Sequence, residues 1–408
     1  PAGPARDHTG RWWNEVNVVA RDALAAGRAS TAYALLERDG LTDGDAFADS
    51  EFLAGFIALR FLKDTHAALA HFQRLDAGVS RPISKSRAYY WEGRSYEALG
   101  DVAQAVERYR LAAALPETFY GQLALTRIRI APVLHLNDTP VEVAPEAEFD
   151  ADPYAPAMRV LGDLGQQVWL RIFATHDSEL NPAPRHLRQL MQVMTEWGFR
   201  AISVRLAKAA SYSGIDMLAF THPVIPLPPY IGPSPAPDPA IVLGLIRQET
   251  EFDPYTVSSA GARGIMQMMG FAAEKSARIA GLPYRPDALL SDVSYNIQLG
   301  MVDFASHQSR WGGSLILAAA SYNGGPTNAR RWIALNGDPR LPGVDPIDWI
   351  EQIPFSETRN YVMRVVENTQ VYRGRLAGHD TPLRILSDLY APNPPPTQVL
   401  DVPVKAAN

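Results

Sequence analysis

Prolines gathered in one short stretch constrain the fold more than any other feature of this sequence. Eight of the 17 residues from Pro223 to Pro239 are proline. Proline lacks a backbone donor and breaks a helix interior, so the stretch is predicted to be an extended, semi-rigid connection between two domains. A second group, Pro392 and Pro394–Pro396, predicts a loose tail at the end of the 408-residue chain.

These two groups predict the domain organisation. We expect a helical domain over residues 1–222, a linker over 223–237, a second domain over 238–378 and a proline-rich tail over 379–408. The predicted fold class is mainly α.

Composition excludes several kinds of protein. The chain has no cysteine, which excludes disulfides, thiolate zinc sites and cysteine nucleophiles. Its net charge of −6 predicts no nucleic-acid partner, because such domains usually carry a basic patch. No apolar run is long enough to predict a transmembrane helix. Residues 1–6 lack an apolar signal core, so we expect any targeting peptide to be missing from this sequence.

Residues 10–220 show helical patterning with an internal repeat. Residues 51–72 and 90–109 resemble each other, and the second copy contains a Gly100-Asp101 turn between its two helices. Residues 23–36 form a weaker third copy. The spacing is near the tetratricopeptide period of about 34 residues. Stacked helix pairs would build a superhelix with a concave surface, and a plain helical bundle is the alternative.

One glutamate stands out in the second predicted domain. Asp238 and Pro239 are a good helix start, and Ile241, Leu245 and Glu249 then fall on one stripe of that helix. A carboxyl group on the buried face would have a raised pKa, as a general acid requires. A solvated or ion-paired glutamate is the alternative. Glu251 is predicted to lie on the opposite face, in solvent.

Three further motifs follow this helix. The turn from Ser258 to Gly264 leads to Gln267 and three methionines, which could form a polar and apolar binding wall or simply a loop and core. An apolar helix ends at Tyr322-Asn323-Gly324-Gly325, which is either a helix cap or a site for orienting a carboxylate and a sugar.

The last of these motifs spans Trp349 to Val365. It places Glu351, Glu357 and Arg359 either in a structural role or along a groove.

The sequence lacks the motifs of three other kinds of functional site. The sequence has no H-E-x-x-H zinc motif, no G-x-S-x-G motif and no Walker A motif. We therefore expect neither a metal nor a cofactor.

Taken together and in this order, these motifs resemble the soluble lytic transglycosylase family. Its Glu-Ser, Gly-Leu-Met-Gln and Ala-Tyr-Asn-X-Gly motifs match residues 249–250, 264–267 and 321–325. Its Ile-Pro-Phe-X-Glu-Thr-Arg-X-Tyr-Val segment matches residues 353–362. Thr250 and Ser321 depart from the family residues. The resemblance covers residues 238–378, and residues 119–124 and 226–230 also resemble that family's helical ring region.

This resemblance implies a lysozyme-like, mostly helical catalytic domain after a helical superhelix, in a periplasmic enzyme. The implied reaction cleaves the β-1,4 bond between N-acetylmuramic acid and N-acetylglucosamine of peptidoglycan strands and forms 1,6-anhydro ends. Glu249 would act as acid and then base, and Tyr322 would hydrogen-bond to it. The substrate groove would be lined by Ser258, Gln267, Met269 and Asn323, with Glu357 near the peptide stem.

Two alternatives remain at this point. A muramidase would hydrolyse the same bond and would use a second carboxylate, for which Asp253 and Glu251 are the candidates. A helical scaffold with a non-catalytic sugar-binding domain is the other alternative, and the intact Glu249 argues against it.

Overall fold

The structure is a computed structural model that describes residues 9–129, 131–136, 146–392 and 400. Most of the predicted tail, including Pro394–Pro396, lies outside the described residues. Contacts divide the chain into two compact units. The first unit contains residues 1–134, 311–367 and 382–408, and the second contains residues 135–310 and 368–381.

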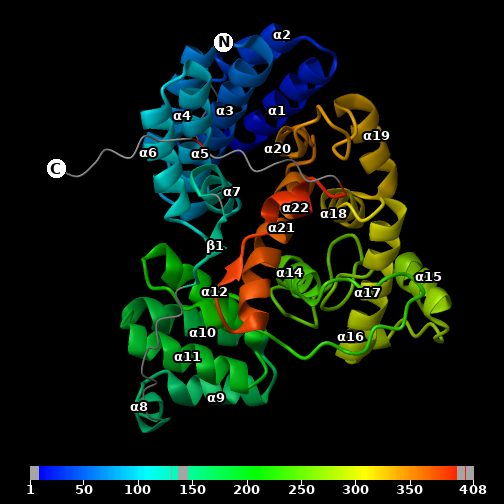
Figure 1. The fold of residues 1–408 in the computed structure, drawn as a ribbon. Coiled ribbons are helices and arrows are strands. Elements are labelled where there is room, and N and C mark those ends of the chain that lie inside the picture. Colours follow the sequence, from blue (N-terminus) through cyan, green and yellow to red (C-terminus); the bar gives the residue numbers. More distant parts are fainter. Residues whose placement is uncertain (1–8, 130, 137–145, 393–399, 401–408) are drawn as a thin grey trace. The chain divides into compact units, whose positions relative to one another are not determined.

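The first unit is built from paired helices (Figure 1). Its elements are α1 (Thr9–Ala25), α2 (Ala29–Leu36), α3 (Gly44–Ile57), the π-helix η2 (Ala58–Leu62), α4 (Thr65–Gly78), α5 (Pro82–Leu99), α6 (Val102–Ala113), α7 (Phe119–Ile128), β1 (Val133–Leu134), α18 (Leu315–Gly324), α19 (Pro326–Asn336), α20 (Pro346–Glu351) and α22 (Ile385–Leu389). Helix α21 (Ser356–Ala377) and strand β2 (Thr381–Pro382) each have residues in both units. The Leu383 amide donates to the Pro132 carbonyl oxygen at 2.8 Å.

In the two predicted repeats, the helix pairs α3–α4 and α5–α6 pack through the same kind of contact. A Cβ atom on Gly55 of α3 would lie 2.6 Å from the Phe72 ring of α4, and one on Gly93 of α5 would lie 2.6 Å from the Tyr109 ring of α6. In each pair the glycine therefore lets an aromatic ring approach the first helix closely. The second helix of each pair is capped by an aspartate whose side chain accepts an amide three residues later.

The repeat helices also hold α20 through a buried carboxylate. Glu351 is fully buried, and its carboxylate accepts from the Tyr120 hydroxyl and from Arg87 Nη2 at 2.6 Å. Arg359 Nε lies 3.8 Å from the same carboxylate, and Arg21 Nη1 donates to the Glu351 backbone oxygen at 2.9 Å. Of the two roles left open for Glu351 and Arg359, this packing supports the structural one.

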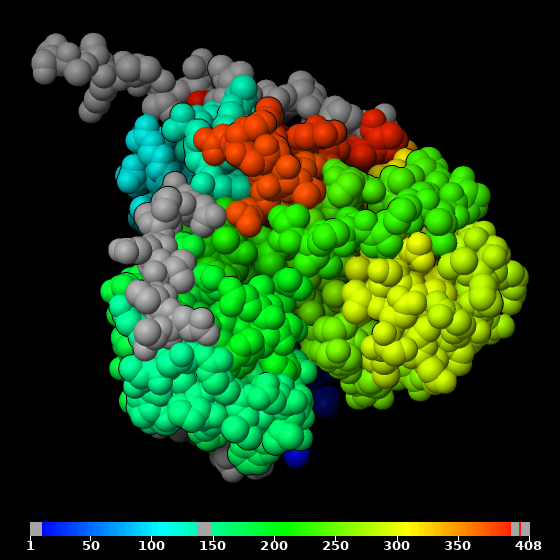
Figure 2. Space-filling view, turned by 90° about the horizontal axis from the view of Figure 1, so that it is seen from below, coloured from blue at the N-terminus to red at the C-terminus, as the bar shows by residue number. Residues whose placement is uncertain are grey.

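The second unit combines a helical bundle with the helix that carries Glu249. Its elements are α8 (Glu146–Asp150), α9 (Ala155–Asp163), α10 (Gln167–Leu180), α11 (Pro184–Glu196), α12 (Arg200–Tyr212), α13 (Leu218–Thr221), α14 (Pro239–Thr250), α15 (Gly270–Ala280), α16 (Ala288–Ser291) and α17 (Val293–Arg310). Figure 2 shows the outer surface of the α8–α12 bundle in teal to green. Leu170, Leu190, Met191 and Met194 lie in its fully buried core.

The mainly α fold class is confirmed. Residues 223–237 contain neither helix nor strand, as their prolines predict. Residues 311–367 share a compact unit with the first helices, whereas the sequence assigned them to the same domain as Glu249. Because a compact unit is not by itself an independently folding domain, the boundaries at 222, 237 and 378 stay a prediction.

Candidate active site

Helix α14 brings Glu249 out of the core at its last turn. Asp238 caps the helix by accepting the Ala240 amide at 2.9 Å, as predicted. Ile241 and Leu245 are buried, but Glu249 is intermediate in exposure, so its predicted burial is wrong. The helix passes through the core for its first turns, and its last turn emerges at the edge of the packed interior.

The residue after Glu249 ties this helix end to the Gln267 loop. The Thr250 hydroxyl donates to the Ile265 carbonyl oxygen at 2.9 Å. A serine in this position would carry the same donor, which explains why the departure from the family motif keeps the contact. Glu251 and Phe252 then adopt φ values of 52° and 71°, and these left-handed conformations turn the chain sharply.

The two carboxylates nearest to Glu249 in the sequence have partners on the helical bundle. Glu251 accepts from Arg205 Nε at 2.7 Å and from Lys208 Nζ at 2.5 Å, so its predicted place in solvent is wrong. Burial acts to raise the pKa of Glu251, but the two cations hold it below its usual value. Asp253 accepts from Gln167 Nε2 at 2.7 Å.

The loop after α14 is held by its own backbone and polar side chains. Ser258 Oγ accepts the Ala262 amide at 3.0 Å. Gln267 has a φ of 49°, and its Nε2 donates to the carbonyl oxygens of Thr256 and Gly264 at 3.0 and 2.9 Å. Gln267 and Met269 are half-buried. The loop therefore presents a fixed rather than an adaptable surface.

A buried asparagine that sequence reasoning missed supports this loop. Asn296 of α17 is fully buried, and its Oδ1 accepts the Met266 amide at 3.0 Å. Its Nδ2 donates to the carbonyl oxygens of Arg263 and Leu289 at 2.9 Å each. A Cβ atom on Gly264 would lie 2.1 Å from the Leu289 oxygen, so only glycine fits there. The sequence feature that could have identified Asn296 is a polar residue on an otherwise apolar stripe of its helix.

The remaining predicted site residues lie in the first unit, at the end of α18 and the start of α21. Tyr322 and Asn323 occupy the last turn of α18 and are half-buried. Asn323 Oδ1 accepts from the Thr358 hydroxyl at 2.7 Å, and its Nδ2 donates to Glu357 Oε1 at 3.4 Å. Glu357 is exposed in the first turn of α21.

Ser321, the second departure from the family motif, has its own structural role. Its hydroxyl accepts from Trp311 Nε1 at 2.7 Å inside the first unit. Gly325 has a φ of 85°, which ends α18 as predicted for a glycine in this place.

The structure thus groups the predicted residues into two sets. Glu249, Ser258, Gln267 and Met269 belong to the second unit, and Tyr322, Asn323 and Glu357 belong to the first. Among the described residues, one group with metal-ligand geometry occurs, formed by Asp152, Asp177 and His186, and none of these is a predicted site residue. Within the same described ranges, no helix has the length and hydropathy needed to cross a lipid bilayer.

Residues 233–340 match the family described as the transglycosylase SLT domain. This stretch of the chain is therefore similar to an SLT domain. Residues 352–380 match a second family, the soluble lytic transglycosylase helical domain. The resemblance inferred from the motifs is thereby confirmed, although the helical-domain match falls on α21 rather than on residues 119–124.

The curated relatives that match part of this chain are longer proteins. The soluble lytic murein transglycosylase of Salmonella typhimurium is 34% identical over 132 residues, which are 32% of this chain and 20% of that protein. The chain therefore aligns with about a fifth of the length of this curated relative.

Two solved structures share the fold over most of the chain. An inactive glutamate-to-glutamine variant of the lytic transglycosylase Slt of Pseudomonas aeruginosa has a TM-score of 0.66 at 23% identity, covering 91% of this chain and 59% of that one. The 70 kDa soluble lytic transglycosylase of Escherichia coli has a TM-score of 0.64 at 22% identity, covering 90% and 59%.

Proposed function

We propose that this chain is a lytic transglycosylase that cleaves the β-1,4 bond between N-acetylmuramic acid and N-acetylglucosamine in peptidoglycan. The SLT domain match and the names of its relatives support this activity. The observation that carries the proposal is the half-buried Glu249 at the end of α14, tied through Thr250 to the Gln267 loop. The same relatives support a periplasmic location.

In the proposed mechanism one glutamate serves twice. Protonated Glu249 donates to the glycosidic oxygen, and an oxocarbenium-like state forms at C1. Glu249 then removes the proton of the muramic C6 hydroxyl, whose oxygen attacks C1 and closes a 1,6-anhydro ring. Because the nucleophile belongs to the substrate, no second carboxylate is needed, unlike in most glycosidases.

The same proposal assigns roles to the residues around Glu249. Tyr322 would hydrogen-bond to Glu249 and orient its carboxyl group. Ser258, Gln267, Met269 and Asn323 would line the sugar groove, and Glu357 would contact substrate near its peptide stem. The rigid hydrogen bonding of the Gln267 loop supports a preformed groove.

The hydrogen bonds made by Glu251 and Asp253 favour the transglycosylase reaction over hydrolysis. A muramidase would need Glu251 or Asp253 as its second acid. Glu251 is held by Arg205 and Lys208, and Asp253 by Gln167. Both are therefore engaged by partners on the α10–α12 bundle.

Product masses test the proposal. Digested peptidoglycan analysed by mass spectrometry should yield fragments that are one water lighter than hydrolytic fragments. Fragments that all carry reducing ends would identify a muramidase instead. Glu251→Gln is the matched control for Glu249→Gln, since it removes the rival carboxylate and should leave the anhydro products unchanged.

A further inference from the structure

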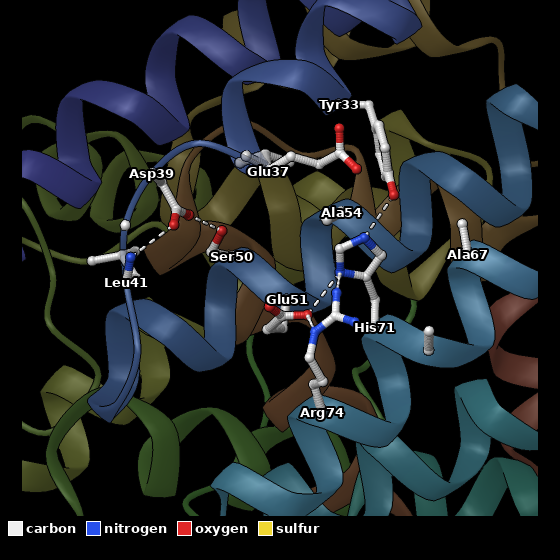
Figure 3. Close-up of a pocket in the computed structure, with 13 residues that line it drawn as sticks. Tyr33, Glu37, Asp39, Leu41, Ser50, Glu51, Ala54, Ala67, His71 and Arg74 are labelled. Atoms are coloured by element: carbon white, nitrogen blue, oxygen red, sulfur yellow. Dashed lines mark hydrogen bonds and ion pairs between the residues drawn. The ribbon is translucent and has the colours of Figure 1, made fainter. Parts of the chain in front are cut away.

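A polar cavity in the first unit lies among the first repeat helices and contains none of the predicted site residues. It has a volume of about 400 Å³, is open to solvent on one side, and is lined by α2, α3 and α4 with the loop after α2 (Figure 3). This volume falls within the usual range for small-molecule sites of about 300–1,000 Å³. Ala54, Ala67 and Ala70 line it, and their small side chains leave the space open.

A connected set of hydrogen bonds forms one wall of this cavity. His71 is 5% exposed, and its Nε2 lies 2.9 Å from the Tyr33 hydroxyl. Its Nδ1 lies 2.7 Å from Glu51 Oε2, which also accepts from Arg74 Nε at 3.0 Å. Arg74, which also lines the cavity, is thus paired with this carboxylate, and its Nη2 lies 2.6 Å from His71 Nδ1.

Carboxylates outnumber cations around this space. Asp39 lines the opposite wall, where it accepts the Leu41 amide at 2.9 Å and the Ser50 hydroxyl. Glu37 lies at the end of α2, on the same side as Tyr33 (Figure 3). Burial and the Glu37 carboxylate raise the pKa of Tyr33 to about 12, so the phenol stays protonated and adds no charge to this wall.

We propose that this cavity binds a primary ammonium group, such as that of a lysine-like side chain on a short peptide. An ammonium group offers three donors and no acceptor, which matches a wall of carboxylates and a phenol oxygen. The Tyr33 ring adds a face that attracts cations. The inference is independent of the proposed enzymatic activity, because it concerns binding to helices α2–α4 alone.

Calorimetric titration of the full chain with Nα-acetyl-lysine methylamide tests this inference. We expect saturable binding of this probe and loss of binding when its side-chain amine is acetylated, because acetylation removes the charge. Glu37→Gln should weaken binding about tenfold, which corresponds to about 1.4 kcal/mol, because it removes a charged acceptor of the ammonium group. Glu37 is exposed, so this variant should fold.

Glu107→Gln is the matched control, because Glu107 is an exposed carboxylate on α6 outside the cavity. It should leave binding unchanged. Equal binding of the acetylated probe, equal weakening by both variants, or absence of binding would each overturn the inference. Preferential binding of Nα-acetylglycine, which carries a carboxylate and no amine, would overturn it in favour of an anion site.

Discussion

Two helices of this protein begin alike and end in glutamates with opposite surroundings. Helices α14 and α20 both start with an Asp-Pro pair, and in each the aspartate caps the helix by accepting the amide two residues later. Helix α14 delivers Glu249 to the edge of the core, beside a loop held by neutral hydrogen bonds. Helix α20 delivers Glu351 into full burial among arginines.

The comparison shows that tertiary contacts, not the local helix signal, decide what a glutamate does. A carboxyl group that must exchange protons with substrate needs access. A carboxylate that holds helices together needs burial with several donors. Substitutions test this distinction between an accessible and a buried glutamate, from the largest expected effect to the smallest.

Glu249→Gln should abolish cleavage and leave the fold intact. Removing a general acid typically costs about 10²–10⁴ in rate, and we expect about 10³ here. Release of soluble fragments from purified cell walls measures the rate, and thermal unfolding measures the fold. A variant that still releases anhydro fragments at the native rate would contradict the assignment of Glu249.

Glu351→Gln should destabilise the fold rather than remove a catalytic group. It leaves the guanidinium groups of Arg87 and Arg359 without their buried carboxylate, and breaking such a pair costs about 3–5 kcal/mol. Urea unfolding should show this loss in the free energy of unfolding. Glu107→Gln, an exposed pair with Arg110, should change that free energy by less than about 0.5 kcal/mol. Equal effects of the two substitutions would refute the structural role of Glu351.

Asn296→Leu should affect both stability and activity at an intermediate level. It removes two hydrogen bonds to the Gln267 loop and one to Leu289 of α16, and should cost about 2 kcal/mol of unfolding free energy. We expect cleavage to fall at least about tenfold with Glu249 unchanged, because the loop is displaced. Ser294→Ala, on the exposed side of the same helix, is the control and should be silent. Unchanged cleavage in Asn296→Leu would show that loop position does not matter.

Glu92 is a third glutamate to compare with Glu249 and Glu351. It has a single arginine as its partner, and its substitution should have the smallest effect. Burial raises the pKa of this α5 carboxyl from 4.5 to about 7, and Arg108 at 3.1 Å opposes the shift only in part. Because the folded state holds the proton more tightly, the free energy of unfolding should fall as the pH rises from 4.5 to about 7. Glu92→Gln should remove that dependence and stabilise the protein by about 1 kcal/mol at pH 8. Parallel pH profiles of the two proteins would contradict this.

Local signals in the sequence predicted the elements well. Asp238 and Pro239 predicted the start of α14, and the similarity of residues 51–72 and 90–109 predicted repeated helix pairs. These features depend on residues within about one or two helices along the chain, so they can be predicted from the sequence pattern.

Long-range contacts account for what the sequence did not predict. The exposure of Glu249 depends on where the core ends, and the partners of Glu251 lie on α12, more than 40 residues earlier. The role of Asn296 depends on carbonyl groups of a loop that precedes it by about 30 residues. No periodicity encodes such pairings, because they follow from the tertiary packing of separate segments.

The burial of Glu351 also bears on how the protein is made. Arg87 and Glu351 are separated by 264 positions, and Arg21 and Glu351 by 330. The first helices therefore complete this part of their core only after Glu351 has been synthesised. Contacts of such high sequence separation slow folding. The first helices are thus expected to remain loosely structured, and open to chaperones, until α20 has been synthesised.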